Sequence, residues 1–278
     1  EVRTAGDAPA GRIAEGEVSQ VGQSTIINFT SSDPFRRWEN ASVIRGAANG
    51  TVSAIAYAPL GDITADQFRA LARIQRHFKS DVRLSNRQNV VFRSLQPNQM
   101  RELYDMLDAI GMAQPGAELA RDVVACPGAD TCNIAVTQSR GLAKAIGEKL
   151  EEEGLAEVGG VRINISGCTN SCGQHHASDI GFFGAERRAH GKSLPGYQML
   201  LGGYVGEEQI HFGEKALRLP AKAAPEAVAR VVRRFAAERE AAETFQGWLA
   251  RSGGAVGVAD GLRDLDDIPL PDNAPDFF

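Results

Sequence analysis

The residues of this sequence that are best suited to chemistry are its four cysteines, which stand in two short segments. Five residues separate Cys126 from Cys132, three separate Cys168 from Cys172, and 35 residues lie between the two pairs. A cubane iron–sulfur cluster needs four thiolates that converge from different directions, and two loops brought together by a fold can supply them. The sequence therefore predicts an iron–sulfur cluster with Cys126, Cys132, Cys168 and Cys172 as its ligands.

Structural zinc, disulfides and buried free thiols are the alternatives for these cysteines. Zinc ligand pairs usually have two to four residues between them, so the second loop fits zinc but the first is too wide. Four cysteines in 278 residues are too few for a disulfide scaffold. Glycines in both loops let backbone amides point at cluster sulfides, although Pro127 limits this in the first loop.

The composition indicates an ordinary globular protein. The chain has 278 residues, is 43% hydrophobic and carries a formal net charge of -5. This charge and the lack of Lys- or Arg-rich runs argue against nucleic acid and anionic membranes as partners. No apolar run reaches the roughly 18 residues of a membrane-spanning helix, so a soluble protein is expected. The grouping of the cysteines favours a metal site in a reducing compartment, and the cytoplasm is the expected one. The sequence begins with Glu1, and a processed product or a fragment is compatible with this end.

The first cysteine loop is preceded by a predicted unit at residues 36–112. Residues 1–35 are expected to be an arm or linker with one strand-like run at 25–29. Within the unit, the polar run 85–89 interrupts an apolar strand pattern. The predicted elements are strands at 52–57, 82–84 and 90–92, a helix begun by a capping box of Thr64 and Gln67, and a second helix between Pro97 and Gly111.

Residues 113–278 are predicted to form a second unit that carries both cysteine loops. The strand at 161–165 alternates with a period of two and leads directly into the second loop, so we expect it to aim that loop. The other predicted elements are a helix from about 133 to 154, strands at 179–183 and 197–201, a long helix from Pro225 that reaches Phe245 and Trp248, and an extended acidic tail at 264–278.

Several motifs together resemble the nitrite and sulfite reductases that couple siroheme to a four-iron four-sulfur cluster. The likeness extends over about residues 38–248 and matches the C-terminal half of that family. It rests on the spacing Cys126-x5-Cys132, Gly167-Cys168-Thr-Asn-Ser-Cys172-Gly-Gln174, Asp179-Ile-Gly-Phe-Phe-Gly184, Ala58-Pro-Leu-Gly-Asp-Ile-Thr64 and Arg83-Leu-Ser-Asn-Arg-Gln-Asn89. The fold class implied is α+β: a half ferredoxin-like unit followed by a mixed α/β domain that binds the cluster and siroheme.

The resemblance also implies roles for individual residues. The four cysteines would ligate the cluster, and Cys172 would in addition be the axial ligand of the siroheme iron, which makes Cys172 and Arg87 the expected catalytic residues. Siroheme carries many carboxylates, so multidentate donors suit its pocket. The expected cofactor-binding residues are Arg83, Arg87, Gln88, Asn89, Thr131, Asn133, Asn170 and Cys172.

Simpler interpretations of these polar residues remain open. The run 85–89 could be a solvated turn between two strands, and Asn133 could cap the following helix. His175 and His176 follow the second loop directly and could donate protons or hydrogen bonds, with local packing as the alternative.

The function implied is the six-electron reduction of nitrite to ammonia or of sulfite to sulfide, with nitrite slightly favoured by Asn170-Ser-Cys-Gly-Gln174 followed by Asp-Ile-Gly-Phe. Ferredoxin or a similar one-electron carrier is the expected donor. Family members usually carry two copies of each unit, whereas this sequence has one, and it lacks the motif that brings a substrate-binding arginine. We therefore expect an N-terminal half or a partner chain to complete the site. The alternatives are a non-catalytic iron–sulfur electron-transfer subunit and a cobalamin-pathway relative of the same fold.

Overall fold

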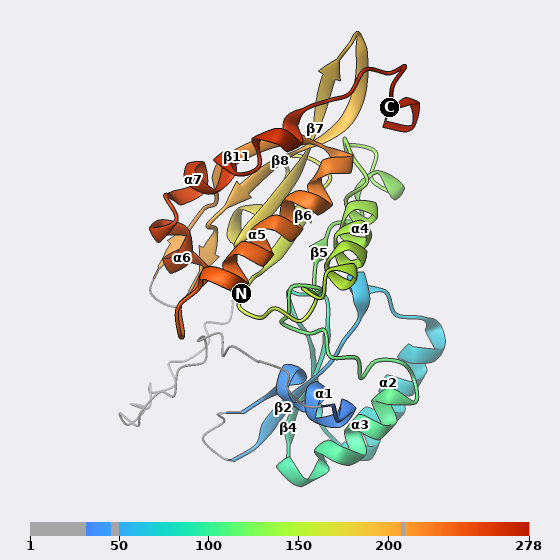
Figure 1. The fold of residues 1–278 in the computed structure, drawn as a ribbon. Helices are drawn as coiled ribbons and strands as arrows, with labels where there is room; N and C mark the ends of the chain where they lie inside the picture. Colours follow the sequence, from blue (N-terminus) through green and yellow to red (C-terminus); the bar gives the residue numbers. More distant parts are fainter. Residues whose placement is uncertain (1–31, 46–49, 207–208, 278) are drawn as a thin grey trace, which may run out of the picture.

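The computed structural model describes residues 32–45, 50–206 and 209–277. The strand-like run predicted at 25–29 and most of the predicted arm lie outside these residues. The described chain forms two units, each with its own hydrophobic core, and the unit with the cysteine loops lies above the other in Figure 1. No described helix is long and apolar enough to cross a membrane.

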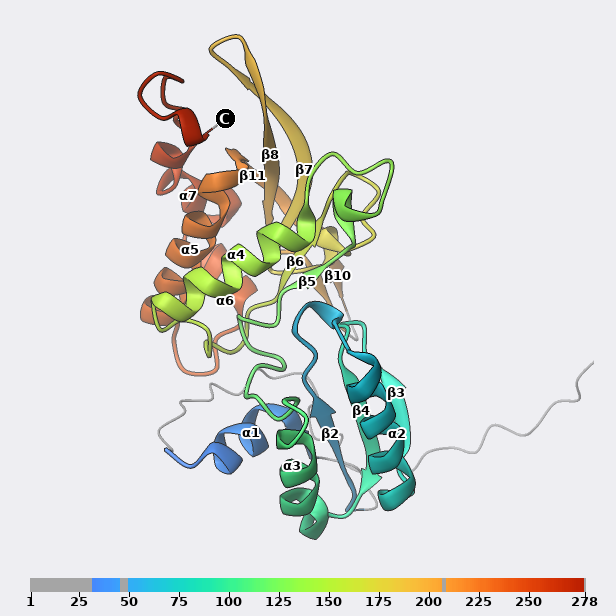
Figure 2. The same ribbon diagram turned by 90° about the vertical axis from the view of Figure 1, so that its right-hand side faces the viewer.

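The first unit is an antiparallel sheet covered by helices (Figure 2). Its strand order is β1-β2-β4-β3, and the predicted strands and the capping box of Thr64 with Gln67 are confirmed. The elements are α1 (Pro34–Ser42), β1 (Val43–Ile44), β2 (Val52–Ala56), α2 (Ala65–Phe78), β3 (Asp81–Leu84), β4 (Val90–Leu95) and α3 (Met100–Asp108).

The second unit is a five-stranded mixed sheet with the order β11-β8-β7-β6-β5. Strands β5, β6 and β7 are parallel, while β8 and β11 are antiparallel to their neighbours. Its regular elements are β5 (Val124–Ala125), α4 (Ser139–Glu152), β6 (Ile163–Ser166), β7 (Ile180–Ala189), β8 (Lys192–Leu201), β9 (Tyr204–Val205), β10 (Ile210–His211), β11 (Glu214–Pro220), α5 (Ala224–Glu238), α6 (Phe245–Arg251) and α7 (Gly254–Asp260).

The helices of the second unit pack on one face of this sheet. Alternate residues of the strands, including Ile163, Ile165 and Phe182, share a buried core with side chains of α4, α5, α6 and α7. Figures 1 and 2 show these helices as one layer beside the strands. The fold is therefore the expected α+β arrangement, with a half ferredoxin-like unit followed by a mixed α/β unit.

Two helix predictions are wrong in their bounds. The helix expected from about residue 133 begins at Ser139, because residues 132–138 form turns that pack against the second cysteine loop. The long helix expected from Pro225 ends at Glu238 and is followed by α6 and α7, with Ala242 and Gly253 in the left-handed backbone region between them. Apolar side chains from all three helices still fill one core, which is why their pattern resembled a single helix.

Other parts of the second unit were not predicted. Strand β11 and the short pair β9 and β10 have no counterpart among the expected elements. In the tail, short turns of 3-10 helix at Arg263–Asp266 and Pro275–Phe277 interrupt the expected extended chain.

Candidate cluster site at the ends of two parallel strands

The two cysteine loops meet because they leave the same edge of the sheet. Strand β5 ends one residue before Cys126, and β6 ends two residues before Cys168. The two strands are parallel neighbours, with Val124 opposite Asn164 and Ala125 opposite Ile165. Carboxyl ends of parallel strands lie at one edge of a sheet, so the loops that follow them lie side by side.

Gly167 joins the two loops. Its N–H donates to Cys126 Sγ at 3.2 Å, and its carbonyl oxygen accepts from the N–H groups of Val136 and Thr137. A Cβ at position 167 would lie 2.9 Å from the Thr137 carbonyl oxygen and 3.0 Å from Gly128 Cα. Glycine is therefore required for the loops to approach this closely.

The surroundings of Cys126 suit a metal-bound thiolate. Its sulfur accepts the Gly167 N–H and lies 3.3 Å from Ser139 Oγ, which donates to the Cys126 carbonyl oxygen at 2.7 Å. A hydrogen bond to sulfur such as that from Gly167 stabilises the negative charge of a cluster and raises its reduction potential. These contacts and an all-thiol donor set fit an iron–sulfur cluster.

The four sulfur atoms differ in exposure. Cys126, Cys132 and Cys168 are half-buried, whereas Cys172 is exposed. Over the described ranges, no group of three or more His, Cys, Asp or Glu side chains is arranged to hold a metal ion. The evidence for the site is therefore the contact between the loops and the chemistry of the donors.

The histidines after the second loop are packed against its base. His175 is fully buried, its Nδ1 lies 2.8 Å from Ser166 Oγ, and its ring lies 5.0 Å from the ring of Phe183. Burial, assisted by His176, lowers the pKa of His175 to about 4, so this imidazole is neutral at pH 7. His176 is half-buried and its ring lies 5.7 Å from the ring of Phe212.

The predicted cofactor residue Arg87 lies in a buried ion pair between the two units. Its Nε lies 3.0 Å from Asp122 Oδ2, and its Nη2 donates to the Asp122 carbonyl oxygen at 3.0 Å. Burial raises the pKa of Asp122, and the charge of Arg87 opposes this shift. A third contact joins Arg87 to Glu118 at 3.3 Å.

Asn89 and Gln88 join the same connection. Asn89 is buried, its Nδ2 donates to Asp122 Oδ2 at 3.0 Å, and its Oδ1 accepts the Ala58 N–H. Gln88 Nε2 donates to the Ala125 carbonyl oxygen at 2.9 Å, one residue before Cys126, and its buried Oε1 has no hydrogen-bond partner among the described residues. The run 85–89 is therefore a turn between β3 and β4, as the simpler interpretation expected, but Arg87 and Asn89 are buried and its side chains bond the segment that leads into the first cysteine loop.

The remaining predicted site residues are exposed. Arg83 pairs with Asp81 and donates to the Val82 carbonyl oxygen at 2.9 Å. Thr131 and Asn133 lie in the first cysteine loop and Asn170 lies in the second. Asn133 is six residues before α4 and does not cap it. The roles of all four in cofactor binding stay predictions.

Sequence reasoning missed Asp122, Ser139 and Ser166. A sequence signal existed for Asp122, because it is a single carboxylate beside the apolar run 123–125. Ser166 stands where an alternating strand ends, which is a position for a polar side chain to bond the following loop. Nothing in the sequence distinguished Ser139 from an ordinary residue inside the helix predicted from about residue 133.

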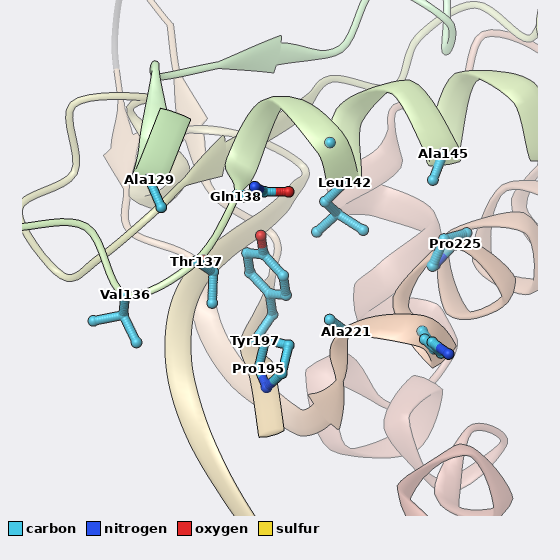
Figure 3. A pocket seen from close by; sticks show the side chains of 12 residues that line it. Ala129, Val136, Thr137, Gln138, Leu142, Ala145, Pro195, Tyr197, Ala221 and Pro225 are labelled. Atoms are coloured by element: carbon cyan, nitrogen blue, oxygen red, sulfur yellow. The ribbon is translucent and has the colours of Figure 1, made fainter. Parts of the chain in front are cut away.

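A cavity of about 500 Å³ lies beside the first cysteine loop, on the helix side of the sheet. In Figure 3 the hydroxyl end of Tyr197 points toward Gln138. Burial raises the pKa of Tyr197 to about 12, so the phenol is protonated at pH 7. The rest of the lining is largely apolar and includes Val136, Leu142, Pro195 and Pro225.

Two known protein families match the two units of this chain. Residues 116–255 match the family described as "Nitrite and sulphite reductase 4Fe-4S domain". Residues 46–110 match the family described as "Nitrite/Sulfite reductase ferredoxin-like half domain". The first of these matches alone covers half of the chain.

Two curated relatives illustrate the range of the similarity. The chain is 36% identical over 162 residues to a ferredoxin–nitrite reductase of Synechococcus elongatus, covering 58% of this chain and 31% of that protein. It is 28% identical over 237 residues to a sulfite reductase [ferredoxin] of Mycobacterium tuberculosis, covering 82% of this chain and 42% of that protein. The chain therefore spans less than half the length of these relatives.

Two solved structures are also similar to this chain. The Mycobacterium tuberculosis NirA protein superposes with a TM-score of 0.65 at 28% identity, covering 80% of this chain and 41% of that chain. Dissimilatory sulfite reductase I superposes with a TM-score of 0.60 at 11% identity, covering 79% of this chain and 70% of that chain, which shows a shared fold. The chain belongs to the nitrite and sulfite reductase family and combines its ferredoxin-like half domain with its 4Fe-4S domain.

Proposed function

We propose that this chain is the cluster-bearing part of a siroheme-dependent oxidoreductase that reduces nitrite to ammonia or sulfite to sulfide, with nitrite favoured. The observation that carries this proposal is the meeting of the two cysteine loops at the ends of β5 and β6, joined by the Gly167 N–H to Cys126 Sγ contact. Ferredoxin or a similar one-electron carrier is the proposed donor, because relatives of both kinds are named for it.

The four cysteines are proposed to hold the cluster, with Cys172 shared with the siroheme iron. The exposure of Cys172 supports this assignment, because a thiolate that faces outward can contact a second centre. When bound, siroheme supplies an iron site at which the anion is reduced. Thr131, Asn133 and Asn170 are exposed on the same two loops, and we propose that they hydrogen-bond the cofactor.

We propose that Arg83 and the run 85–89 contact the cofactor and also position the first cysteine loop. Arg83 is exposed and Gln88 is half-buried, and we propose that both donate to the carboxylates of the cofactor. For Arg87 and Asn89, cofactor binding remains a prediction beside their observed bonds to Asp122. Through these bonds the half ferredoxin-like unit holds the segment before Cys126 in place.

Reduction of an anion requires positive charge and proton donors at the reacting atoms. We propose that an N-terminal half or a partner chain supplies part of them. We also propose that the unit boundary lies between residues 112 and 113 and that the chain works in the cytoplasm. The grouping of the four cysteines into two short loops suits a cluster site in a compartment that keeps thiols reduced.

A non-catalytic electron-transfer subunit is the second candidate. The observation in its favour is that Arg87 and Asn89, two of the predicted cofactor donors, are engaged by Asp122. Such a protein would bind the cluster and no siroheme.

The experiment is reconstitution of the full chain under anaerobic conditions with iron, sulfide and siroheme, followed by absorption spectroscopy. Chlorin-type bands that remain with the protein through gel filtration, together with broad cluster absorption, are the expected result. Cluster absorption alone would favour the electron-transfer subunit. Absence of both would contradict the proposed function. Parallel nitrite and sulfite turnover with a reduced donor then identifies the preferred anion.

A further inference from the structure

The second cysteine loop is closed at its base by two side chains of β6. Ser166 Oγ accepts the Gly173 N–H at 3.0 Å, and Asn164 Nδ2 donates to the Gly173 carbonyl oxygen at 2.9 Å. Gly173 directly follows Cys172, and Ser166 stands two residues before Cys168. These two hydrogen bonds therefore fix the distance between the two ends of the loop that carries both thiols.

His175 holds Ser166 in place. Its Nδ1 lies 2.8 Å from Ser166 Oγ, so the hydroxyl bonds both the loop and the imidazole. His175 cannot easily move, because it is fully buried and its ring lies against Phe183. Its backbone is also tightly packed, since a Cβ at Gly181 would lie 1.9 Å from the His175 carbonyl oxygen.

The backbone of the loop is strained and needs such support. Ser171 has φ +60° and Gln174 has φ +58°, so two residues with side chains adopt the left-handed conformation on either side of Cys172. Conformations of this kind persist only where the surrounding structure imposes them. Gly173, between them, lies so close to β6 that a Cβ would meet the Ile165 carbonyl oxygen at 2.0 Å.

We propose that Asn164, Ser166 and His175 form a clasp that positions Cys168 and Cys172 for ligation, and that the Ser166–His175 pair controls how long the cluster is retained. These are positioning residues, because they act on the ligands through the backbone of Gly173. The inference rests on the proposed function in one respect, namely that the chain binds a cluster.

The test compares variants of the full chain after anaerobic reconstitution with iron and sulfide. Ser166→Ala removes the hydroxyl, and His175→Phe removes the Nδ1 contact while keeping an aromatic ring against Phe183. We expect the rate of iron release to a chelator to rise about tenfold in both variants, as expected for loss of a buried hydrogen bond. The electron paramagnetic resonance spectrum of the reduced cluster should broaden as the ligand geometry loosens.

Three further variants separate positioning from general stability. Ser166→Thr keeps the hydroxyl and His175→Asn keeps a polar nitrogen near the Nδ1 position, so both should release iron within about twofold of the wild type. Ser178→Ala is the matched control, because the buried Ser178 hydroxyl donates to the Ile180 carbonyl oxygen at 3.0 Å, with the His175 carbonyl oxygen at 3.3 Å as its second acceptor, and bonds neither Ser166 nor the His175 imidazole. It should leave the release rate and the spectrum unchanged, whatever its effect on the melting temperature.

Equal release rates in Ser166→Ala, His175→Phe and the wild type would overturn the clasp, as would a failure of His175→Asn to restore retention. If Ser166→Ala does not fold, the two His175 variants decide the question. A wild-type chain that takes up no iron and sulfide contradicts the proposed function itself. A wild-type chain that holds the cluster beside unaffected variants contradicts the clasp alone.

Discussion

Arg87 Nε lies 3.0 Å from Asp122 Oδ2, and both side chains are buried between the half ferredoxin-like unit and the cluster unit. Arg87 belongs to the loop between β3 and β4, whereas Asp122 stands four residues before Cys126. A charge pair at this place makes the position of the first cysteine loop depend on the fold of the neighbouring unit.

Loss of Arg87 should therefore destabilise the protein strongly. Arg87→Met leaves the Asp122 carboxylate buried without its partner, which typically costs about 3–5 kcal/mol of the free energy of unfolding. Urea unfolding of the apoprotein at pH 7 measures this loss. Arg83→Met is the control, because Arg83 is exposed and an exposed ion pair contributes at most about 1 kcal/mol. Equal losses in the two variants would contradict the importance of burial.

The double variant Arg87→Met/Asp122→Asn tests whether the loss in Arg87→Met comes from the unpaired Asp122 carboxylate. It removes both charges, so we expect it to recover part of the stability lost in Arg87→Met. A double variant less stable than Arg87→Met would show that Asp122 is held mainly by Asn89 and the Glu118 N–H, which also bond its carboxylate.

Gly173 should tolerate no side chain. A Cβ at this position would lie 2.0 Å from the Ile165 carbonyl oxygen, so Gly173→Ala forces strand β6 and the second cysteine loop apart. We expect a loss of at least about 2 kcal/mol in the free energy of unfolding, as for other changes that overpack a well-filled site. Iron uptake on reconstitution should fall as well.

Gly147→Ala provides the matched control for this substitution. Gly147 lies inside α4, and a Cβ there meets no atom within 4 Å. Alanine has the higher helix propensity, so this variant should gain up to about 1 kcal/mol and keep full iron uptake. If both alanine variants bind iron equally well, close packing at Gly173 is not needed for the site.

The buried carboxyl group of Asp179 should make stability depend on pH. Burial raises its pKa from 3.8 to about 6, while the Arg162 N–H and the Gln246 side chain oppose the shift by hydrogen bonding. Between these two pH values the folded state keeps a proton that the unfolded state has lost. The free energy of unfolding therefore decreases as pH rises from about 4 to about 6, by up to about 3 kcal/mol, and this contribution is constant above that range.

Asp179→Asn removes the titrating group. Chemical denaturation at pH 4.5, 5.5 and 6.5 should show a flatter pH dependence for this variant than for the wild type. Asp264→Asn is the control, because Asp264 is an exposed carboxylate paired with Arg230. It should leave the pH dependence of the free energy of unfolding nearly unchanged. An unaltered slope in Asp179→Asn would mean that Asp179 titrates near the usual pH for a carboxyl group.

The cysteines of the apoprotein should differ in reactivity toward an alkylating reagent. Cys172 is exposed and the other three are half-buried, so mass spectrometry after brief labelling should find Cys172 modified first. Reconstitution with iron and sulfide should protect all four, because ligated thiolates are shielded by the metal. Continued labelling of Cys172 in the reconstituted protein would exclude it from the ligand set.

The sequence by itself was enough to predict the kind of site this protein carries and most of its elements. The number, type and spacing of the cysteines predicted a cluster site in their two loops, and local patterns predicted the capping box at Thr64 and the strands that precede and follow the second loop. These features are local, since they depend on residues within a few positions of one another.

Only the tertiary structure showed which polar groups hold the segments around the cysteine loops. Cofactor binding by Arg87, Gln88 and Asn89 stays a prediction. The structure shows that their side chains bond Asp122 and Ala125, which are more than 30 positions away in the sequence. The role of Ser166 likewise depends on the imidazole of His175, which the chain brings back to β6 after turning through the second loop. The sequence pattern also did not predict the break between α5 and α6. Both helices are buried against a shared core, which gives them one continuous apolar pattern.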